Sequence, residues 1–140
     1  MRTFTYDRRL QWSECDAGGI VFFPNYARWM VDGLNEMLLS LGINPNEAGA
    51  ATTRGGLPVL QLTMKFSSAP ALYQRVTHQI AVVKLGGKSL TFVHRFLREG
   101  ELLMEAEETR VWAQHDLTNP QALRALPIPD GVRALLEQND

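Results

Sequence analysis

Residues 16 to 26 are the most informative segment of the chain and read Asp16-Ala17-Gly18-Gly19-Ile20-Val21-Phe22-Phe23-Pro24-Asn25-Tyr26. Pro24 suits the first position of a helix, because its φ is close to the helical value and it lacks an N–H that would have no partner there. The free N–H groups of the first turn, such as that of Phe23, and the helix dipole can bind an anion or a developing oxyanion. The order of residues therefore predicts a carboxylate, Asp16, beside the positive end of a helix.

The helix predicted after Pro24 carries one broad apolar stripe. The residues of the stripe recur at spacings of three and four and are Tyr26, Trp29, Met30, Leu34, Met37, Leu38 and Leu41. We expect about four to five turns, with Gly42 as the C-cap. Gly33 lies on or near the apolar face, where a glycine costs roughly 1 kcal/mol relative to alanine. A close approach of the helix to a sheet explains this glycine better than a tolerated defect does.

Length and composition indicate one domain, residues 1–140. The 140 residues are 45% hydrophobic, which is enough for a core, and the net charge of −1 gives no bulk attraction to nucleic acid or to an anionic membrane. The lone Cys15 excludes an internal disulfide and a cysteine-based metal site. Residues 1–6 lack the apolar core of a signal peptide, and no apolar run is long enough to span a bilayer. We therefore expect a cytoplasmic protein.

Most of the remaining chain is predicted to form strands. The expected strands cover residues 3–13, 59–67, 73–85, 89–99 and 101–113, with a short one at 123–126. In the first of them, Phe4, Tyr6, Leu10 and Trp12 share one parity. Gly86-Gly87 and Glu99-Gly100 are residue pairs suited to tight hairpin turns. Long strands joined by short turns indicate an antiparallel meander.

Two further segments complete the predicted chain. Residues 44–57 are rich in Gly, Ala, Asn and Thr and are expected to form a loop with room for a short helical turn at 47–51. Residues 130–136 are expected to form a small helix. The fold class is then α+β, with an antiparallel sheet wrapped around one long central helix. Strands this long leave an exposed edge that a second copy of the chain usually pairs with, so we expect at least a homodimer.

The chain resembles the hotdog-fold acyl-CoA thioesterases, in particular the 4-hydroxybenzoyl-CoA thioesterase group. That family has a catalytic Asp, two variable residues, Gly, two aliphatic residues, two aromatic residues and a Tyr three positions on. The matching residues are Asp16, Gly19, Ile20, Val21, Phe22, Phe23 and Tyr26, and Cys15, Pro24, Asn25, Arg28 and Trp29 also resemble the aromatic-acyl branch. The resemblance implies a hotdog fold, an acyl-CoA substrate, no metal or redox cofactor, and a homodimer or homotetramer.

The resemblance also indicates where coenzyme A lies. In the 4-hydroxybenzoyl-CoA type, a basic residue followed by Ser, and an Arg near the C-terminal strand, sit near the nucleotide phosphates; here these positions are Lys88, Ser89 and Arg124. Gly86 and Gly87 stand where that type has two further arginines.

The proposed chemistry needs an activated group and a stabiliser for an oxyanion, and the sequence has no Ser-His-Asp order or thiol–imidazole pair. Asp16 can attack the carbonyl to form a mixed anhydride, or act as general base on water, while the N–H of Phe23 polarises the carbonyl oxygen. The sequence leaves both routes open. Gly19, Tyr26 and Trp29 are the other expected substrate-binding residues, although the two aromatic ones fit a core role equally well.

The other residues with reactive or ionisable side chains are expected to have structural roles. Cys15 has no nearby cation in sequence and is expected to be a half-buried thiol, and Glu14 a solvated loop carboxylate able to tune Asp16. The three histidines, His78, His94 and His115, lack metal-ligand spacing and are expected to be exposed or hydrogen-bonded. On a strand Glu108 faces away from Glu105 and Glu107, and a solvated or subunit-facing strand is expected there.

Three other functions compete with acyl-CoA hydrolysis. A dehydratase or isomerase on the same fold would need a His–acid pair on the central helix, which has no His. An acyl-carrier-protein thioesterase and a non-catalytic acyl-CoA binding module both fit the same motif.

The stretch Gly86-Gly87-Lys88-Ser89 imitates a phosphate-binding loop, but Val82 replaces the required earlier glycine, so a hairpin turn is expected.

Overall fold

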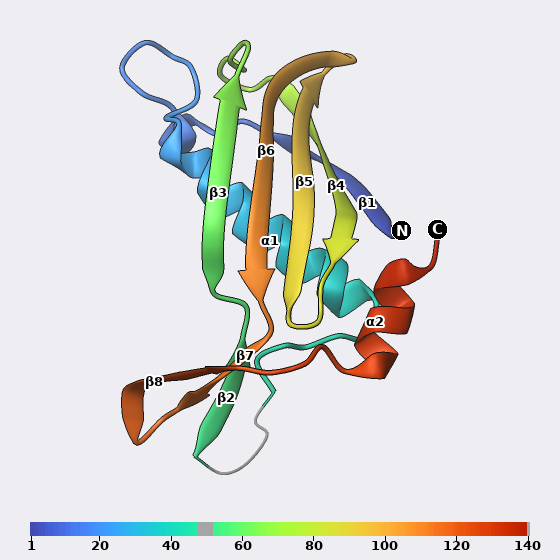
Figure 1. The fold of residues 1–140 in the computed structure, drawn as a ribbon. Coiled ribbons are helices and arrows are strands. Elements are labelled where there is room, and N and C mark those ends of the chain that lie inside the picture. Colours follow the sequence, from blue (N-terminus) through green and yellow to red (C-terminus); the bar gives the residue numbers. More distant parts are fainter. Residues whose placement is uncertain (48–51, 140) are drawn as a thin grey trace.

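The computed structural model describes residues 1–47 and 52–139. The elements, in chain order, are β1 (Thr3–Arg9), η1 (Trp12–Glu14), α1 (Pro24–Ser40), β2 (Thr53–Gly56), β3 (Val59–Phe66), β4 (Arg75–Leu85), β5 (Ser89–Arg98), β6 (Glu101–Val111), β7 (Ala113–Asp116), β8 (Asn119–Ala125) and α2 (Asp130–Glu137). Five strands form one antiparallel sheet in the order β1-β4-β5-β6-β3. Helix α1 lies across one face of this sheet (Figure 1). The predicted α+β fold, an antiparallel sheet on one long helix, is confirmed.

The first strand is shorter than predicted. β1 ends at Arg9, and the 3-10 turn η1 follows, in which the N–H of Gln11 donates to Oε1 of Glu14 and the N–H of Glu14 donates to the carbonyl of Gln11. Trp12 therefore lies outside the strand, does not point to the inward-facing side of β1, and is 73% exposed. The capping residues of η1 outweigh the alternating pattern that predicted a strand to residue 13.

The region after α1 differs most from the prediction. Residues 53–56 form β2, which pairs with β7, so the expected loop over 44–57 contains a strand. The strand expected over 101–113 is divided into β6 and β7, and the short strand at 123–126 is the end of the longer β8. β2, β7 and β8 form a second sheet that projects below the first (Figure 1). The helical turn expected at 47–51 lies largely outside the described residues.

Helix α1 ends one residue earlier than predicted. Leu41 is the C-cap, and Gly42 follows it with a φ of +75°, the left-handed conformation that favours glycine. The N–H of Ile43 donates to the carbonyl of Leu38, and that of Gly42 to Leu39. This is a Schellman motif, which satisfies the last carbonyls of the helix.

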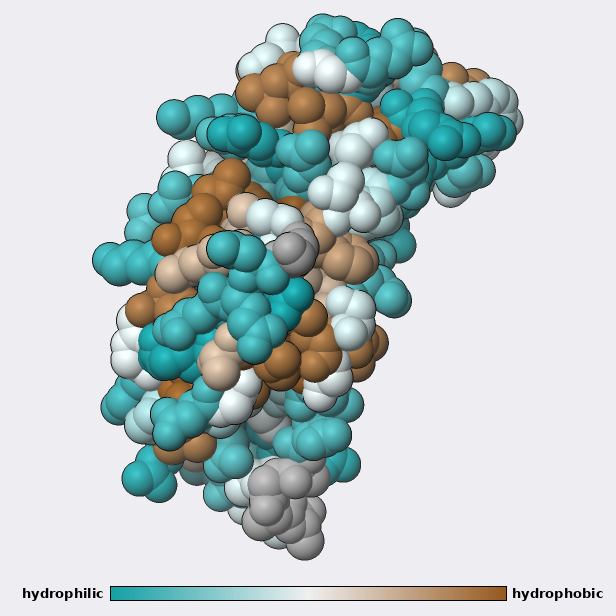
Figure 2. Space-filling model, turned by 90° about the vertical axis from the view of Figure 1, so that its right-hand side faces the viewer, coloured by the Kyte–Doolittle hydropathy of each residue, from teal (hydrophilic) through white to brown (hydrophobic). Residues whose placement is uncertain are grey.

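The core between α1 and the sheet has two parts. One surrounds Tyr26 and Trp29 near the start of the helix, and the other surrounds Leu34 and Met37 nearer its end. Side chains from α2 and the segment before it complete the second part, for example Leu136. The side of the molecule that carries both termini is mixed, with apolar patches separated by hydrophilic side chains (Figure 2).

A buried polar chain crosses the sheet between the two parts of the core. The hydroxyl of Tyr6 lies 2.8 Å from Nδ1 of His78, whose Nε2 lies 2.9 Å from Nδ1 of His94. Nε2 of His94 lies 2.9 Å from the carboxylate of Glu108, which also pairs with Arg110 at 3.1 Å. His78 and His94 are thus hydrogen-bonded, as expected. Glu108 is only 1% exposed, so the expectation of a solvated or subunit-facing strand is wrong for this residue.

Candidate active site

The loop that carries Asp16 is closed at its base by short backbone contacts. Cys15 and Val21 form a β-bridge, and the N–H of Asp16 donates to the carbonyl of Ile20 at 2.8 Å. Gly19 has a φ of +78°, so the turn requires glycine there. The N–H of Gly18 donates to Oδ1 of Asp16 at 2.8 Å, and the other carboxylate oxygen has no partner among the described residues. An exposed carboxylate therefore stands on a well-defined turn.

The start of α1 leaves one amide free. The N–H of Phe22 donates to the carbonyl of Glu14, that of Asn25 to Phe22 and that of Tyr26 to Phe23. Pro24 has no N–H. Between residues 22 and 26, the N–H of Phe23 is consequently the amide without a partner among the described residues. It lies at the positive end of the helix dipole, where it can donate to an oxyanion.

A cavity of about 580 Å³ adjoins this helix start. It is lined by Asp16, Ile20, Val21, Phe22, Phe23, Tyr26, Phe66, Ser67, Ser68 and Ala69. The ring of Phe66 lies edge-on to Phe23, with 6.1 Å between their centroids, and 5.8 Å from the ring of Tyr26. Asp16 is the charged residue of this lining, and the rest of it is aromatic, aliphatic or hydroxyl-bearing.

A second hollow, of about 470 Å³, is lined by Trp12, Cys15, Asp16, Ala17, Gly19 and Leu72. Asp16 lines both hollows. A molecule that contacts this carboxylate can therefore extend into either hollow.

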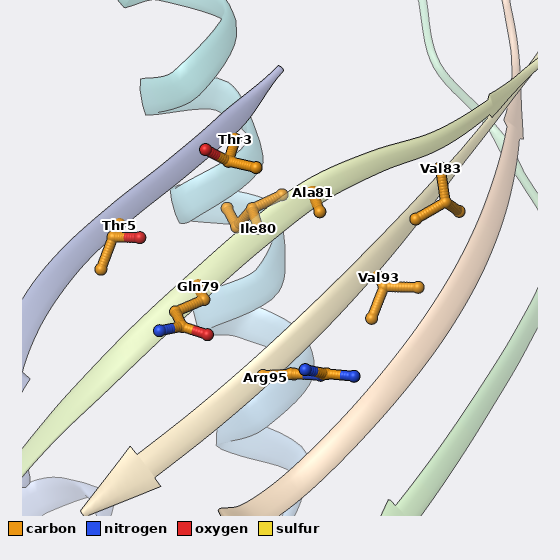
Figure 3. Close-up of a pocket in the computed structure, with 8 residues that line it drawn as sticks. All are labelled: Thr3, Thr5, Gln79, Ile80, Ala81, Val83, Val93 and Arg95. Atoms are coloured by element: carbon orange, nitrogen blue, oxygen red, sulfur yellow. The ribbon is translucent and has the colours of Figure 1, made fainter. Parts of the chain in front are cut away.

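A third hollow, of about 440 Å³, lies on the face of the sheet that is turned away from α1 (Figure 3). Its walls come from β1, β4 and β5, with Thr5, Gln79 and Arg95 among them. It contains none of the residues that the sequence predicts for the site. The two hollows beside Asp16 therefore remain the candidate active site.

Only some of the predicted site residues lie together. Asp16, Gly19, Phe23 and Tyr26 lie together around the loop and the helix start. Trp29 is 2% exposed and lies in the core beneath them.

Lys88 lies in the β4–β5 turn and Ser89 begins β5, both near the opposite end of α1 (Figure 1), and Arg124 is an exposed residue of β8. Within one chain these three residues are therefore not brought to Asp16. The turn at residues 86–89 is a hairpin, as predicted, closed by a hydrogen bond from the N–H of Gly86 to the carbonyl of Ser89.

Several residues of the site were not predicted. Phe66, Ser67 and Ser68 follow Asp16 by about fifty positions in the sequence and reach the cavity only because β3 ends beside α1. Glu14 was expected to be solvated, but its side chain is 15% exposed and binds Arg8 and the indole N–H of Trp29. Its position before Asp16 is visible in the sequence, whereas its partners on β1 and α1 are not.

The cavity lining contains two acidic groups, the carboxyl of Asp16 and the phenol of Tyr26. Burial raises the pKa of Tyr26 to about 12, although the positive charge of Arg98 opposes the shift. Tyr26 is therefore a neutral phenol at pH 7, and its hydroxyl has no hydrogen-bond partner among the described residues. Cys15 is half-buried, as expected, with Sγ 3.5 Å from the carbonyl oxygen of Gln11.

The described part of the chain has neither a metal-binding cluster nor a helix suited to crossing a membrane. Residues 1–47 and 52–139 hold no group of three His, Cys, Asp or Glu side chains arranged to bind a metal ion. None of the helices in those residues has the length and apolar character needed to cross a membrane.

Comparisons with known proteins point to one family. The model of the thioesterase-like superfamily matches residues 10–136. A 4-hydroxybenzoyl-CoA thioesterase of Pseudomonas sp. (strain CBS-3) is 28% identical over 135 residues, which cover 91% of this chain and 93% of that protein. The crystal structure of a mutant 4-hydroxybenzoyl-CoA thioesterase complexed with 4-hydroxybenzoyl-CoA matches 98% of this chain and 100% of its own, with a TM-score of 0.81 and 26% identity.

A gentisyl-coenzyme A thioesterase matches 96% of this chain and 100% of its own, with a TM-score of 0.78 and 27% identity. The resemblance inferred from the motif between Asp16 and Tyr26 is therefore confirmed, as is the hotdog fold. Because the family model spans nearly the whole sequence, the chain belongs to the thioesterase-like superfamily.

Proposed function

We propose that this protein is an acyl-CoA thioesterase that hydrolyses the thioester of an aromatic acyl-CoA, such as 4-hydroxybenzoyl-CoA, or of a short-chain acyl-CoA. One observation carries the proposal. The exposed carboxylate of Asp16 and the residue with the unpaired N–H, Phe23, line the same aromatic-walled cavity. A carboxylate and an oxyanion donor beside one cavity are what a thioester carbonyl requires.

Asp16 can act by two routes. As a nucleophile, a carboxylate oxygen bonds to the carbonyl carbon, the C–S bond breaks, coenzyme A leaves as a thiolate that takes up a proton, and water then hydrolyses the mixed anhydride. As a general base, Asp16 takes a proton from water, whose oxygen bonds to the carbonyl carbon, and the proton passes to the departing sulfur. Both routes place negative charge on the carbonyl oxygen, where the N–H of Phe23 and the dipole of α1 stabilise it.

The lining of the cavity supports an aromatic acyl group. Phe23, Phe66 and Tyr26 already pack ring against ring in edge-to-face and tilted geometries. An aryl group can extend this arrangement, and each such contact contributes about 0.5–1.5 kcal/mol beyond the burial of its area. With the acyl group in this cavity, the second hollow, beside Trp12 and Leu72, is left for the pantetheine arm. The names of the relatives, which act on 4-hydroxybenzoyl-CoA and gentisyl-CoA, agree with this substrate class.

A second copy of the chain is proposed to complete the nucleotide site. Helix α1 has 17 residues and is about 25 Å long. Lys88 and Ser89 lie near its far end, so within one chain most of the length of the helix separates them from Asp16. β3 is an edge strand, and four of its apolar side chains are exposed: Val59, Leu60, Leu62 and Phe66. We propose a homodimer formed through this edge, or a homotetramer of such dimers, in which Lys88, Ser89 and Arg124 of another copy meet the phosphates.

No metal or redox cofactor takes part in either route. We also propose that the enzyme is cytoplasmic, because the lone Cys15 cannot form an internal disulfide.

The test is the release of free thiol from benzoyl-, 4-hydroxybenzoyl-, phenylacetyl- and short aliphatic acyl-CoA. The proposal predicts turnover that is fastest with one of the aromatic substrates. Turnover confined to acyl groups on a carrier protein would identify an acyl-carrier-protein thioesterase instead. Saturable binding of acyl-CoA without any turnover would identify a non-catalytic binding module.

A further inference from the structure

Glu14 joins three elements that meet below the Asp16 loop. Its Oε2 accepts hydrogen bonds from Nε1 of Trp29 on α1 at 2.6 Å and from Nη2 of Arg8 on β1 at 2.8 Å. Its Oε1 accepts the N–H of Gln11, at the start of η1, at 2.9 Å. The guanidinium of Arg8 also lies over the ring of Trp29, 4.2 Å from its centroid. The two carboxylate oxygens of Glu14 thus accept three hydrogen bonds, which a carboxylate can do because both of its oxygens are acceptors.

The backbone of Glu14 extends these contacts to the start of α1. Its carbonyl oxygen accepts the N–H of Phe22 at 2.8 Å and Nδ2 of Asn25 at 2.9 Å. Phe22 directly precedes the residue with the free amide, and Glu14 directly precedes Cys15, whose bridge to Val21 closes the Asp16 loop. One residue therefore contacts both segments that carry the proposed chemistry.

We infer that Glu14 is a positioning residue of this active site, which holds the carboxylate of Asp16 and the N–H of Phe23 at a fixed separation. The inference rests on the proposed function. Both groups must act on one carbonyl, and a displacement of about 1 Å can lower the rate about 100-fold. Glu14 itself does not touch the substrate, because its carboxylate faces the core beneath the loop and neither cavity beside Asp16 includes it.

The variant Glu14→Gln tests the inference with little change in shape. Glutamine offers one acceptor oxygen, and its amide N–H₂ would face a donor, so one of the three contacts is lost. Glu105→Gln is the matched control, because Glu105 accepts from Arg95 at the same 2.8 Å but lies on the outer face of the sheet. Each variant is compared with the wild type by kcat and KM for the best acyl-CoA, by Tm, and by hydrogen–deuterium exchange of residues 15–23.

The inference predicts that Glu14→Gln lowers kcat by about 10- to 100-fold with a small change in KM, and speeds exchange in residues 15–23. Glu105→Gln should match the wild type. In an Asp16→Asn background Glu14→Gln should cause no further loss, because residues that act as one unit are not additive. A lower Tm with unchanged kcat, or an additive loss in the double variant, would overturn the inference.

The proposed function can fail separately. If the wild type turns over no thioester, the exchange measurement alone decides the positioning role. Unchanged exchange in residues 15–23 of Glu14→Gln would then overturn it, and faster exchange confined to those residues would support it.

Discussion

Gly33 of α1 lies against the imidazole of His78 on β4. A Cβ atom at position 33 would be 2.7 Å from Cε1 of His78 and 2.8 Å from the hydroxyl oxygen of Tyr6. Glycine at this point lets the helix approach the sheet at the level of the buried polar chain. The close approach of the helix to the sheet that the sequence predicts is therefore confirmed, and the side chain that Gly33 approaches is the imidazole of His78.

Replacing Gly33 by alanine should destabilise the fold although alanine favours helices. The new methyl group must displace His78 or Tyr6, and overpacking of this kind costs about 1–3 kcal/mol. Gly131→Ala is the control, because Gly131 is also helical and a Cβ there would meet nothing within 4 Å. Urea unfolding of both variants checks the prediction. Equal stability of Gly33→Ala and the wild type would contradict the close packing.

Stability should fall as the pH is lowered below about 6.5. Burial, together with the charges of His94 and Arg8, lowers the pKa of His78 from 6.5 to about 2. Between these values the unfolded chain binds a proton at His78 and the folded chain does not. The free energy of unfolding then falls by about 1.4 kcal/mol per pH unit for this one group.

His78→Gln should reduce that slope, because glutamine does not titrate but can still accept from Tyr6 and donate to His94. Urea unfolding at several pH values between 7 and 4 measures the slope for both proteins. An identical slope in the variant would show that His78 is not the group responsible.

Removing the free amide at the start of α1 should slow catalysis. Phe23 has a φ of −55°, which proline can adopt, so Phe23→Pro deletes the N–H with little backbone change. The loss of one oxyanion donor typically costs about 100- to 1000-fold in kcat. Phe23→Ala keeps the N–H and removes only the ring, so it should change KM more than kcat. Comparable kcat values for the two variants would argue against the amide as the oxyanion donor.

The sequence predicts the parts of the molecule that depend on local order. The spacing of Tyr26 to Leu41 predicts α1, and the residues from Asp16 to Pro24 predict a carboxylate near a helix start. β2 was missed because Gly55 and Gly56 are poor strand formers, and pairing with β7 overrides that preference.

Contacts between distant segments could not be predicted in the same way. The alternation of side chains along a strand correctly predicts that Glu108 faces away from Glu105 and Glu107. It does not reveal that His78 and His94 lie beside Glu108 in the core. Likewise the sequence identifies Asp16, whereas Phe66 joins the cavity, and Trp29 binds Glu14, only through the register and packing of the folded chain.

The rate of thiol release by Asp16→Asn, measured beside the wild type with 4-hydroxybenzoyl-CoA, tests whether the carboxylate of Asp16 drives hydrolysis. Asparagine keeps an oxygen that can accept the N–H of Gly18 but can neither take a proton nor form an anhydride. Circular dichroism and Tm establish that the variant is folded. If Asp16 is the nucleophile or the general base, kcat falls by at least about 100-fold in the folded variant. A kcat within a few-fold of the wild type would remove Asp16 from the mechanism.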